Sequence, residues 1–117
     1  MIPQMSGVSL LMKLNDGEVW LVKYRFEEDL TVFKIRPVVV INNQAVSIHG
    51  YKMTSQPMRS SKEYLIKDLH KAGLPKKTVI RTSKFIPLDA KILVRKLGEL
   101  SMADLAGFKA LLHKQQK

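Results

Sequence analysis

Residues 36–59, RPVVVINNQAVSIHGYKMTSQPMR, contain the pattern that decides the fold. Arg36-Pro37 opens a predicted β-strand, because proline has no N–H to donate and belongs at a strand start or on an edge. Four β-branched residues at 38–41 continue the strand, and Asn42-Asn43 is typical of a turn. A second strand is predicted over residues 45–53, ending at Thr54-Ser55. The resulting hairpin is expected to bring Arg36 close to the Lys-x-Thr-Ser-Gln run at residues 52–56.

Another strand is predicted before this hairpin. Residues 18–26, EVWLVKYRF, alternate between two sets of side chains. The more apolar set, expected to face the core, is Trp20, Val22, Tyr24 and Phe26. Asn15-Asp16-Gly17 predicts a turn just ahead of the strand. We therefore expect residues 1–15 to be an N-terminal arm or an extra strand, and residues 16–117 to be a single domain.

Short elements are predicted after the hairpin. Residues 56–61 have the composition of an exposed loop. The segments with strand character are residues 64–66, 78–82, 85–88 and 92–97. Between them, Asp68 is placed to cap one helical turn through Ala72, with Gly73 in the position that ends it. Gly98 is expected to break the last strand.

The C-terminal segment has the pattern of an amphipathic helix. Ser101 and Asp104 resemble a capping box, with aspartate in place of the usual glutamate. The apolar stripe of this helix consists of Leu105, Phe108, Leu111 and Leu112. We expect it to cover an open side of the sheet. Many short strands with one terminal helix predict a mainly β fold, a small and strongly curved antiparallel β-barrel.

Composition points to a folded domain with a polyanionic partner. The chain has 117 residues, 45% of them hydrophobic, and carries 20 Lys and Arg against 10 Asp and Glu, a net charge of +10. This excess favours nucleic acid over an anionic membrane or an acidic protein. The chain has no cysteine, which excludes disulfides and thiol nucleophiles and fits a cytoplasmic location. The longest apolar run near the N-terminus is too short for a signal peptide or a membrane span.

The positive charge is concentrated in the second half of the chain. Twelve basic and three acidic residues lie at positions 51–96, which carry a net +9 of the total +10. Such a field attracts a phosphate backbone, although many of these side chains are expected to be merely solvated. Three aromatic residues lie in the same region and either stack on bases or belong to the core: Tyr51, Tyr64 and Phe85.

Two routes of RNA cleavage are open to a nuclease. A metal-dependent route needs clustered carboxylates, and the one cluster, residues 27–29, sends neighbouring side chains to opposite faces of an extended chain. A metal-free route uses the 2′-hydroxyl of RNA as the nucleophile and needs a cation and hydrogen-bond donors at the phosphate. Arg36, Thr54 and Ser55 supply those groups, although composition alone favours a salt-bridged arginine and ordinary strand-end hydroxyls. The three histidines, His49, His70 and His113, are expected to be packed or exposed instead of catalytic.

Five motifs, in this order and at these spacings, resemble the MazF/PemK family of toxin endoribonucleases over about residues 16–112. They are Gly17-Glu-Val-Trp-Leu-Val, Arg36-Pro-Val-Val-Val-Ile, Lys52-Met-Thr-Ser-Gln, Ala72-Gly-Leu-Pro-Lys-Lys-Thr-Val-Ile-Arg and Leu97-Gly-Glu-Leu-Ser-Met-Ala-Asp-Leu. The chain departs from many family members just before Arg36. Residues 30–35 read LTVFKI there, in place of a glycine-rich loop with a glutamate.

The resemblance implies a Src-homology-3-like barrel that is usually a homodimer. It also implies metal-independent cleavage of single-stranded RNA, typically messenger RNA, by 2′-OH attack that leaves a 2′,3′-cyclic phosphate. The family's catalytic arginine and threonine correspond to Arg36 and Thr54. The residues expected to bind RNA are Lys34, Lys52, Ser55, Gln56, Arg59 and Lys84. No metal or cofactor is expected, and the implied protein partner is an acidic antitoxin, which the net charge of +10 suits.

Two alternatives stay open at this point. A non-catalytic nucleic-acid-binding module would bind RNA with the same basic residues and leave it intact. A toxin of the same fold that poisons DNA gyrase would act through its C-terminal helix and an apolar chain end. This chain ends in the polar run Lys114-Gln-Gln-Lys117, which argues against gyrase as the target.

Overall fold

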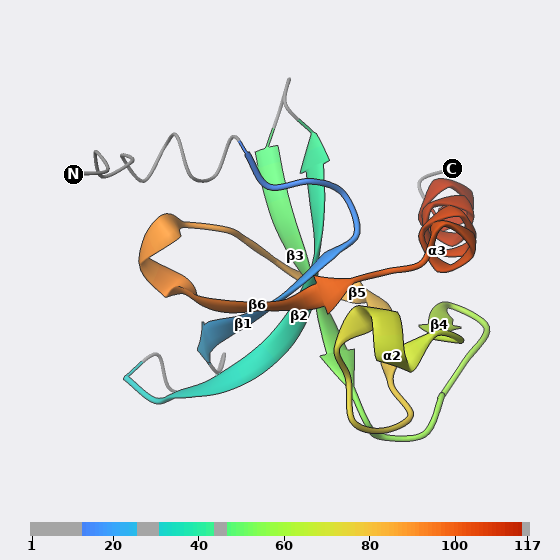
Figure 1. Cartoon of the computed structure of the whole chain (residues 1–117), viewed down its shortest axis with the longest axis horizontal. Coiled ribbons are helices and arrows are strands. Elements are labelled where there is room, and N and C mark those ends of the chain that lie inside the picture. The colour runs from blue at the N-terminus through green and yellow to red at the C-terminus, as the bar shows by residue number, and fades with distance from the viewer. Residues whose placement is uncertain (1–12, 26–30, 44–46, 116–117) are drawn as a thin grey trace.

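Antiparallel strands in a curved sheet, with one long helix beside them, make up the fold (Figure 1). The computed structural model describes residues 13–25, 31–43 and 47–115. The elements in these ranges are β1 (Glu18–Arg25), β2 (Phe33–Asn43), β3 (Ser47–Thr54), β4 (Glu63–Leu65), α2 (Leu69–Ala72), β5 (Val79–Pro87), the 3-10 helix η1 (Ala90–Ile92), β6 (Leu93–Glu99) and α3 (Met102–Gln115). No helix in these ranges is long and apolar enough to cross a membrane.

The sheet has the strand order β4-β5-β3-β2-β1-β6, with β4 and β6 at its edges. The strands cross one another at steep angles in Figure 1, with β4, α2 and α3 gathered on one side. The predicted mainly β, antiparallel architecture with a C-terminal helix is therefore confirmed. The barrel takes the form of a curved open sheet.

The hairpin of β2 and β3 forms as predicted, but the two asparagines expected to form its turn lie within β2. β2 starts at Phe33, before Arg36, and it includes Asn42 and Asn43, which were expected to form the turn. Asn42 stays in the strand because its N–H donates to Asp16 Oδ1 at 2.6 Å and its side-chain Nδ2 donates to the Leu14 carbonyl at 2.7 Å. Residues 44–46, between the strands, lie outside the described ranges.

Pro37 lies inside β2, although it was expected at a strand start or on an edge. It pairs with Leu21 of β1, whereas the ladder to β3 begins only at the next residue, with Val38 opposite Lys52. β2 is therefore paired on one side at Pro37, which is the local equivalent of an edge. The missing N–H of proline is tolerated there.

Both faces of β1 are buried, which corrects the expectation of a single core face. Val19 is fully buried in one cluster with Tyr51, Met53 and Phe108, beneath α3. Val22 belongs to a second cluster on the opposite face of the sheet. The remaining members of the second cluster are Leu14, Val38, Val40 and Leu88, with Trp20 and Tyr24 packed against it. A sheet that curls strongly encloses apolar side chains on both sides, so strict alternation identifies only one of the two cores.

Two glycines allow α2 to lie against β6. Asp68 caps α2 by accepting from the Lys71 N–H, and Gly73 ends it with a left-handed φ of 74°, as predicted. A Cβ on Gly73 would lie 2.1 Å from the Leu97 carbonyl oxygen, and one on Gly98 would lie 2.5 Å from the Lys71 carbonyl oxygen. The prediction that Gly98 breaks the strand is wrong, because β6 continues to Glu99. Because Gly98 has no side chain, the backbones of β6 and α2 can approach each other closely.

The N-terminus of α3 is held by a buried carboxylate. The Asp104 N–H donates to Ser101 Oγ at 3.1 Å, as in the predicted capping box. The Asp104 side chain itself is fully buried and accepts from the Lys67 N–H, the Asp68 N–H and the Tyr64 hydroxyl. Burial alone would raise the pKa of Asp104, but these hydrogen bonds outweigh it and lower that pKa below its usual range. Asp104 therefore fastens α3 to the segment between β4 and α2.

Several predictions concern residues outside the described ranges. The arm at residues 1–12, the strand end at Phe26 and the acidic residues 27–29 belong to this group. The division of the chain into an arm and a domain stays a prediction.

We predict that Asp104→Ala destabilises the fold strongly. The change leaves two backbone N–H groups and the Tyr64 hydroxyl without their acceptor, so the free energy of unfolding falls by about 3–5 kcal/mol. Urea denaturation of both proteins measures this difference. Asp89→Ala is the matched control, because Asp89 is exposed and caps only η1, and its loss costs about 1 kcal/mol or less. Equal losses from the two variants would contradict the role of Asp104.

The bond between Tyr64 and Asp104 also predicts a dependence on alkaline pH. Burial, then the hydrogen bond to Asp104 and its negative charge, raise the pKa of Tyr64 from 10.0 to about 12. A group whose folded pKa is raised contributes its full stability below pH 10.0 and loses it as the pH rises through about 12. The stability difference between the wild type and Tyr64→Phe should thus be constant up to pH 10 and shrink above it. Denaturation of both proteins across this range tests the point, and a difference that grows with pH would refute it.

Candidate functional site

A groove of about 580 Å³ opens where the start of β2 and the end of β3 meet the loop that follows α2. Its lining combines charged, hydroxyl-bearing and apolar side chains. The lining residues are Leu21, Lys34, Arg36, Pro37, Lys52, Met53, Thr54, Ser55, Gln56, Leu74, Pro75, Lys76, Thr78 and Leu97. This set contains both predicted catalytic residues and four of the six predicted RNA-binding residues.

Arg36 and Thr54 come together because of the register of the hairpin. The ladder ends with Val38 opposite Lys52, and Arg36 on β2 and Thr54 on β3 each lie two residues beyond that pair. Residues two apart on a strand project to the same face, so both fall on the face of the Val38–Lys52 pair. Both residues line the groove, as the sequence led us to expect. Their chemical roles stay predictions.

Arg36 is half-buried and lines the groove. Its Nη1 donates to the Ile35 carbonyl at 3.1 Å, which occupies only one of the five guanidinium N–H groups. Within the described ranges no carboxylate lies within 4.0 Å of Arg36. Arg36 therefore forms no salt bridge with the described residues, although composition alone favoured one.

The hydroxyl of Thr54 is oriented by the backbone that follows it. Thr54 Oγ1 accepts from the Gln56 N–H at 3.1 Å, which is a side-chain turn at the end of β3. Since Oγ1 accepts this bond, its own O–H is left to donate to a ligand. Thr54 thus presents a hydrogen-bond donor next to the Arg36 cation.

Lys52 marks the centre of a crowded group of cations. Burial, and then the positive charges of Arg81, Lys84, Arg36 and Arg59, lower the pKa of Lys52. Its Nζ lies 5.5 Å from the centre of the Tyr24 ring, where the ring face stabilises a cation. These positively charged side chains come from several elements of the fold, and an anion in the groove would reduce their mutual repulsion.

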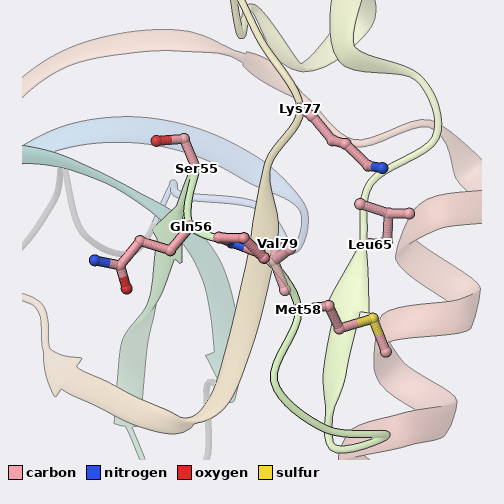
Figure 2. A pocket seen from close by; sticks show the side chains of 7 residues that line it. Ser55, Gln56, Met58, Leu65, Lys77 and Val79 are labelled. Atoms are coloured by element: carbon pink, nitrogen blue, oxygen red, sulfur yellow. The ribbon is translucent and has the colours of Figure 1, made fainter.

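Two predicted RNA-binding residues, Arg59 and Lys84, do not line the groove. They lie close enough to lower the pKa of Lys52, so they belong to its electrostatic surroundings. Ser55 and Gln56 also border a smaller apolar pocket of about 230 Å³, formed with Pro57, Met58 and Leu65 among others. Figure 2 shows the Ser55 and Gln56 side chains pointing away from Met58 and Leu65.

An ion pair that the sequence did not reveal lies behind Gln56. Arg81 Nε is 3.4 Å from Glu63 Oε2, and both side chains are only 10% exposed. Arg81 Nη2 donates to Gln56 Oε1 at 2.8 Å, and Arg59 Nη2 donates to the same oxygen at 2.9 Å. From the sequence, Arg81 was only one of many basic residues and had no individual role. The available signal was two opposite charges, Glu63 just before one predicted strand and Arg81 within another, but the β4–β5 register that pairs them cannot be read from spacing.

The histidines and aromatic residues are mostly structural. The His49 ring packs edge-on against Phe85 with centroids 5.0 Å apart, and none of the three histidines lines the groove. Tyr51 is buried beside Phe108, and Tyr64 bonds to Asp104, so both belong to the packing of the fold. Phe85 is 49% exposed. No three His, Cys, Asp or Glu side chains are grouped as metal ligands within the described ranges.

Comparison with known proteins identifies related sequences and folds. A family model described as "PemK-like, MazF-like toxin of type II toxin-antitoxin system" matches residues 15–115. No curated protein sequence matches the chain significantly.

Several solved structures share the fold. An endoribonuclease from a mycobacterial species is 15% identical, with a TM-score of 0.63 over 86% of this chain and 88% of that chain. An endoribonuclease in complex with its cognate antitoxin, also mycobacterial, is 15% identical, with a TM-score of 0.65 over 86% and 92%. The Mycobacterium tuberculosis toxin MazF-mt6 is 14% identical, with a TM-score of 0.61 over 81% and 93%. At these identities the likeness establishes the fold.

We predict that Lys52→Gln stabilises the protein while it weakens anion binding. The lowered pKa of Lys52 means that its charge opposes folding below that pKa, so its removal should raise the melting temperature at low salt. The gain should shrink in high salt, because screening weakens the repulsion. Affinity for a single-stranded oligonucleotide should fall, with the salt dependence reduced by about one ion.

Thermal melting and fluorescence titration at several salt concentrations measure both effects. Lys91→Gln is the control, since Lys91 is exposed in η1 and does not line the groove. A Lys52→Gln variant that melts lower and binds as tightly as the wild type would overturn this account.

Proposed function

Because this chain belongs to the PemK-like, MazF-like toxins of type II toxin–antitoxin systems, as its motifs indicated, we propose that it is a metal-independent endoribonuclease that cleaves single-stranded RNA. The observation that carries the proposal is the groove in which Arg36, Thr54 and Lys52 lie together. A cation and hydroxyl donors beside a space for the backbone are what RNA cleavage by its own 2′-hydroxyl requires.

The proposed reaction is attack of the 2′-oxygen on the adjacent phosphorus. The 2′-hydroxyl loses its proton, the bond from phosphorus to the 5′-oxygen breaks, and the 5′-oxygen takes up a proton. The products are a 2′,3′-cyclic phosphate and a 5′-hydroxyl. Arg36 supplies a permanent charge to the phosphate oxygens, and the Thr54 hydroxyl donates a hydrogen bond to one of them. The oriented Thr54 hydroxyl supports this assignment, because its acceptor side is already engaged by Gln56 N–H.

The proposed substrate contacts extend from these two residues along the groove. Lys34, Lys52, Ser55 and Gln56 line it and would bind the backbone and bases of messenger RNA. Arg59 and Lys84 would add to the attraction of the phosphate backbone without contact at the scissile bond. The lowered pKa of Lys52 supports a site suited to an anion.

The proposed biological setting is that of a toxin with a neutralising partner. One solved structure with this fold is described as a complex with its cognate antitoxin, and we propose an acidic antitoxin for this chain too. The net charge of +10 supports such a partner. We further propose a homodimer that acts in the cytoplasm, where messenger RNA is translated.

We predict that Arg36→Ala lowers the rate of RNA cleavage by about 10²–10³-fold, the usual loss when one charge-stabilising donor is removed. Arg36→Lys should also lose most activity, because a single ammonium does not reproduce the guanidinium fork. The assay is single-turnover cleavage of single-stranded RNA in EDTA, with mass spectrometry of the ends to detect a cyclic phosphate. Lys91→Ala should cleave at the wild-type rate.

Three outcomes would count against the proposal. Wild-type protein that leaves diverse RNA intact, and whose expression does not slow growth, would rule out the toxin activity. Activity that appears only with added divalent metal would rule out the metal-free route. If Arg36→Ala weakened salt-sensitive RNA binding and no product formed with any variant, a non-catalytic binding module would be the correct description.

A further inference from the structure

The side chain of Gln56 is held at the groove by two arginines. Arg81 Nη2 and Arg59 Nη2 both donate to the same atom, at 2.8 Å and 2.9 Å. An arginine side chain carries donors only, so the atom that faces two of them must be the amide oxygen and not the nitrogen. The chemistry of the neighbours therefore fixes which way the Gln56 amide points.

A single carboxylate holds both arginines in place. Glu63 stands opposite Arg81 in the β4–β5 ladder, and its Oε2 lies 3.4 Å from Arg81 Nε. Glu63 Oε1 accepts from the Arg59 backbone N–H at 2.6 Å. Arg81 is only 8% exposed, so its guanidinium has little room to move. The orientation of Gln56 is thus set by the sheet and does not depend on the ligand.

This arrangement removes one of the two hydrogen-bonding faces of Gln56. A carbonyl oxygen has two lone pairs, and the two arginines use both. The amide nitrogen, with two N–H donors, is the group left for a ligand. Gln56 lines the same groove as Arg36 and Thr54, and its side chain points away from the neighbouring apolar pocket (Figure 2).

We propose that Gln56 is a specificity-determining residue that reads one base of the RNA as a fixed donor. It selects O4 of uracil or O6 of guanine over the amino group that occupies the same position in cytosine or adenine. A free glutamine reads adenine by using its oxygen and nitrogen together, and that mode is closed here because the oxygen is engaged. Arg81 and Glu63 are positioning residues. The inference rests on the proposed RNA substrate but not on its cleavage.

The decisive variant is Gln56→Glu, which keeps the size of the side chain and reverses its donor character. One carboxylate oxygen still accepts from Arg59 and Arg81, and the other now faces the ligand as an acceptor. The base preference at one position should therefore invert, from uracil and guanine to adenine and cytosine. A residue with a merely structural role would change the overall affinity and leave the preference as it was. Gln56 is exposed, so the substitution should not impair folding.

The experiment exposes a random-sequence single-stranded RNA pool to each protein in EDTA and sequences both the bound molecules and the cut ends. For the wild type we expect uracil plus guanine to exceed adenine plus cytosine about threefold to tenfold at one position, the effect of one hydrogen bond. Gln56→Glu should reverse that ratio. Arg81→Lys keeps the charge beside Glu63 and loses the bond to Gln56, so the ratio should fall toward one at that position alone.

The two readouts separate this inference from the proposed function. Cleavage with no such position, or with the same preference in Gln56→Glu, would overturn the inference and leave the nuclease intact. Bound RNA that shows the preference and its inversion, without any cut ends, would support the inference and overturn the nuclease. Protein that neither binds nor cuts the pool would overturn both.

Discussion

The buried carboxylate of Asp104 is the interaction on which the arrangement of this protein depends. It joins the first turn of α3 to the backbone of Lys67 and Asp68 and to the Tyr64 hydroxyl. Tyr64 lies in β4 beside Glu63, which pairs with Arg81 across the ladder to β5. Arg81 in turn holds Gln56 in the groove. A helix that contributes no side chain to the groove lining is therefore connected to it through hydrogen bonds, the peptide bond between Glu63 and Tyr64, and one ion pair.

The groove itself opposes stability. Cations from several elements surround Lys52 and lower its pKa, and the described residues place no carboxylate within ion-pair distance of Arg36. The energy needed to keep these charges close comes from well-packed regions elsewhere, such as the cluster around Phe108 and Ile80. Functional sites often violate the local rules that stabilise the rest of a fold. For the same reason, sequence patterns are expected to describe such sites less well than the rest of a fold.

Much of the fold was predictable because it depends on local patterns. The β2–β3 hairpin, the turn at Gly17, the Asp68 cap and the Ser101 cap each depend on residues close in sequence, and each is present. The approach of Arg36 to Thr54 followed from the hairpin alone. The errors arose where distant contacts decide the outcome. Asn42 is held in a strand by Asp16, and Gly98 serves a contact with α2; neither partner is visible in a window of neighbouring residues. The Glu63–Arg81 pair was missed for the same reason, since it needs the register of two strands far apart in the chain.

Part of the positive charge lies on an edge strand of the open sheet, where it affects pairing between copies of the chain. β6 is an edge strand of seven residues, long enough for a second copy of the chain to add its own edge to the sheet. Arg95 and Lys96 lie in the middle of that edge and are exposed. Two such edges that approach in antiparallel order would bring like charges together, which disfavours their pairing. Resistance to pairing at this edge and attraction of a polyanion thus draw on the same surplus of charge.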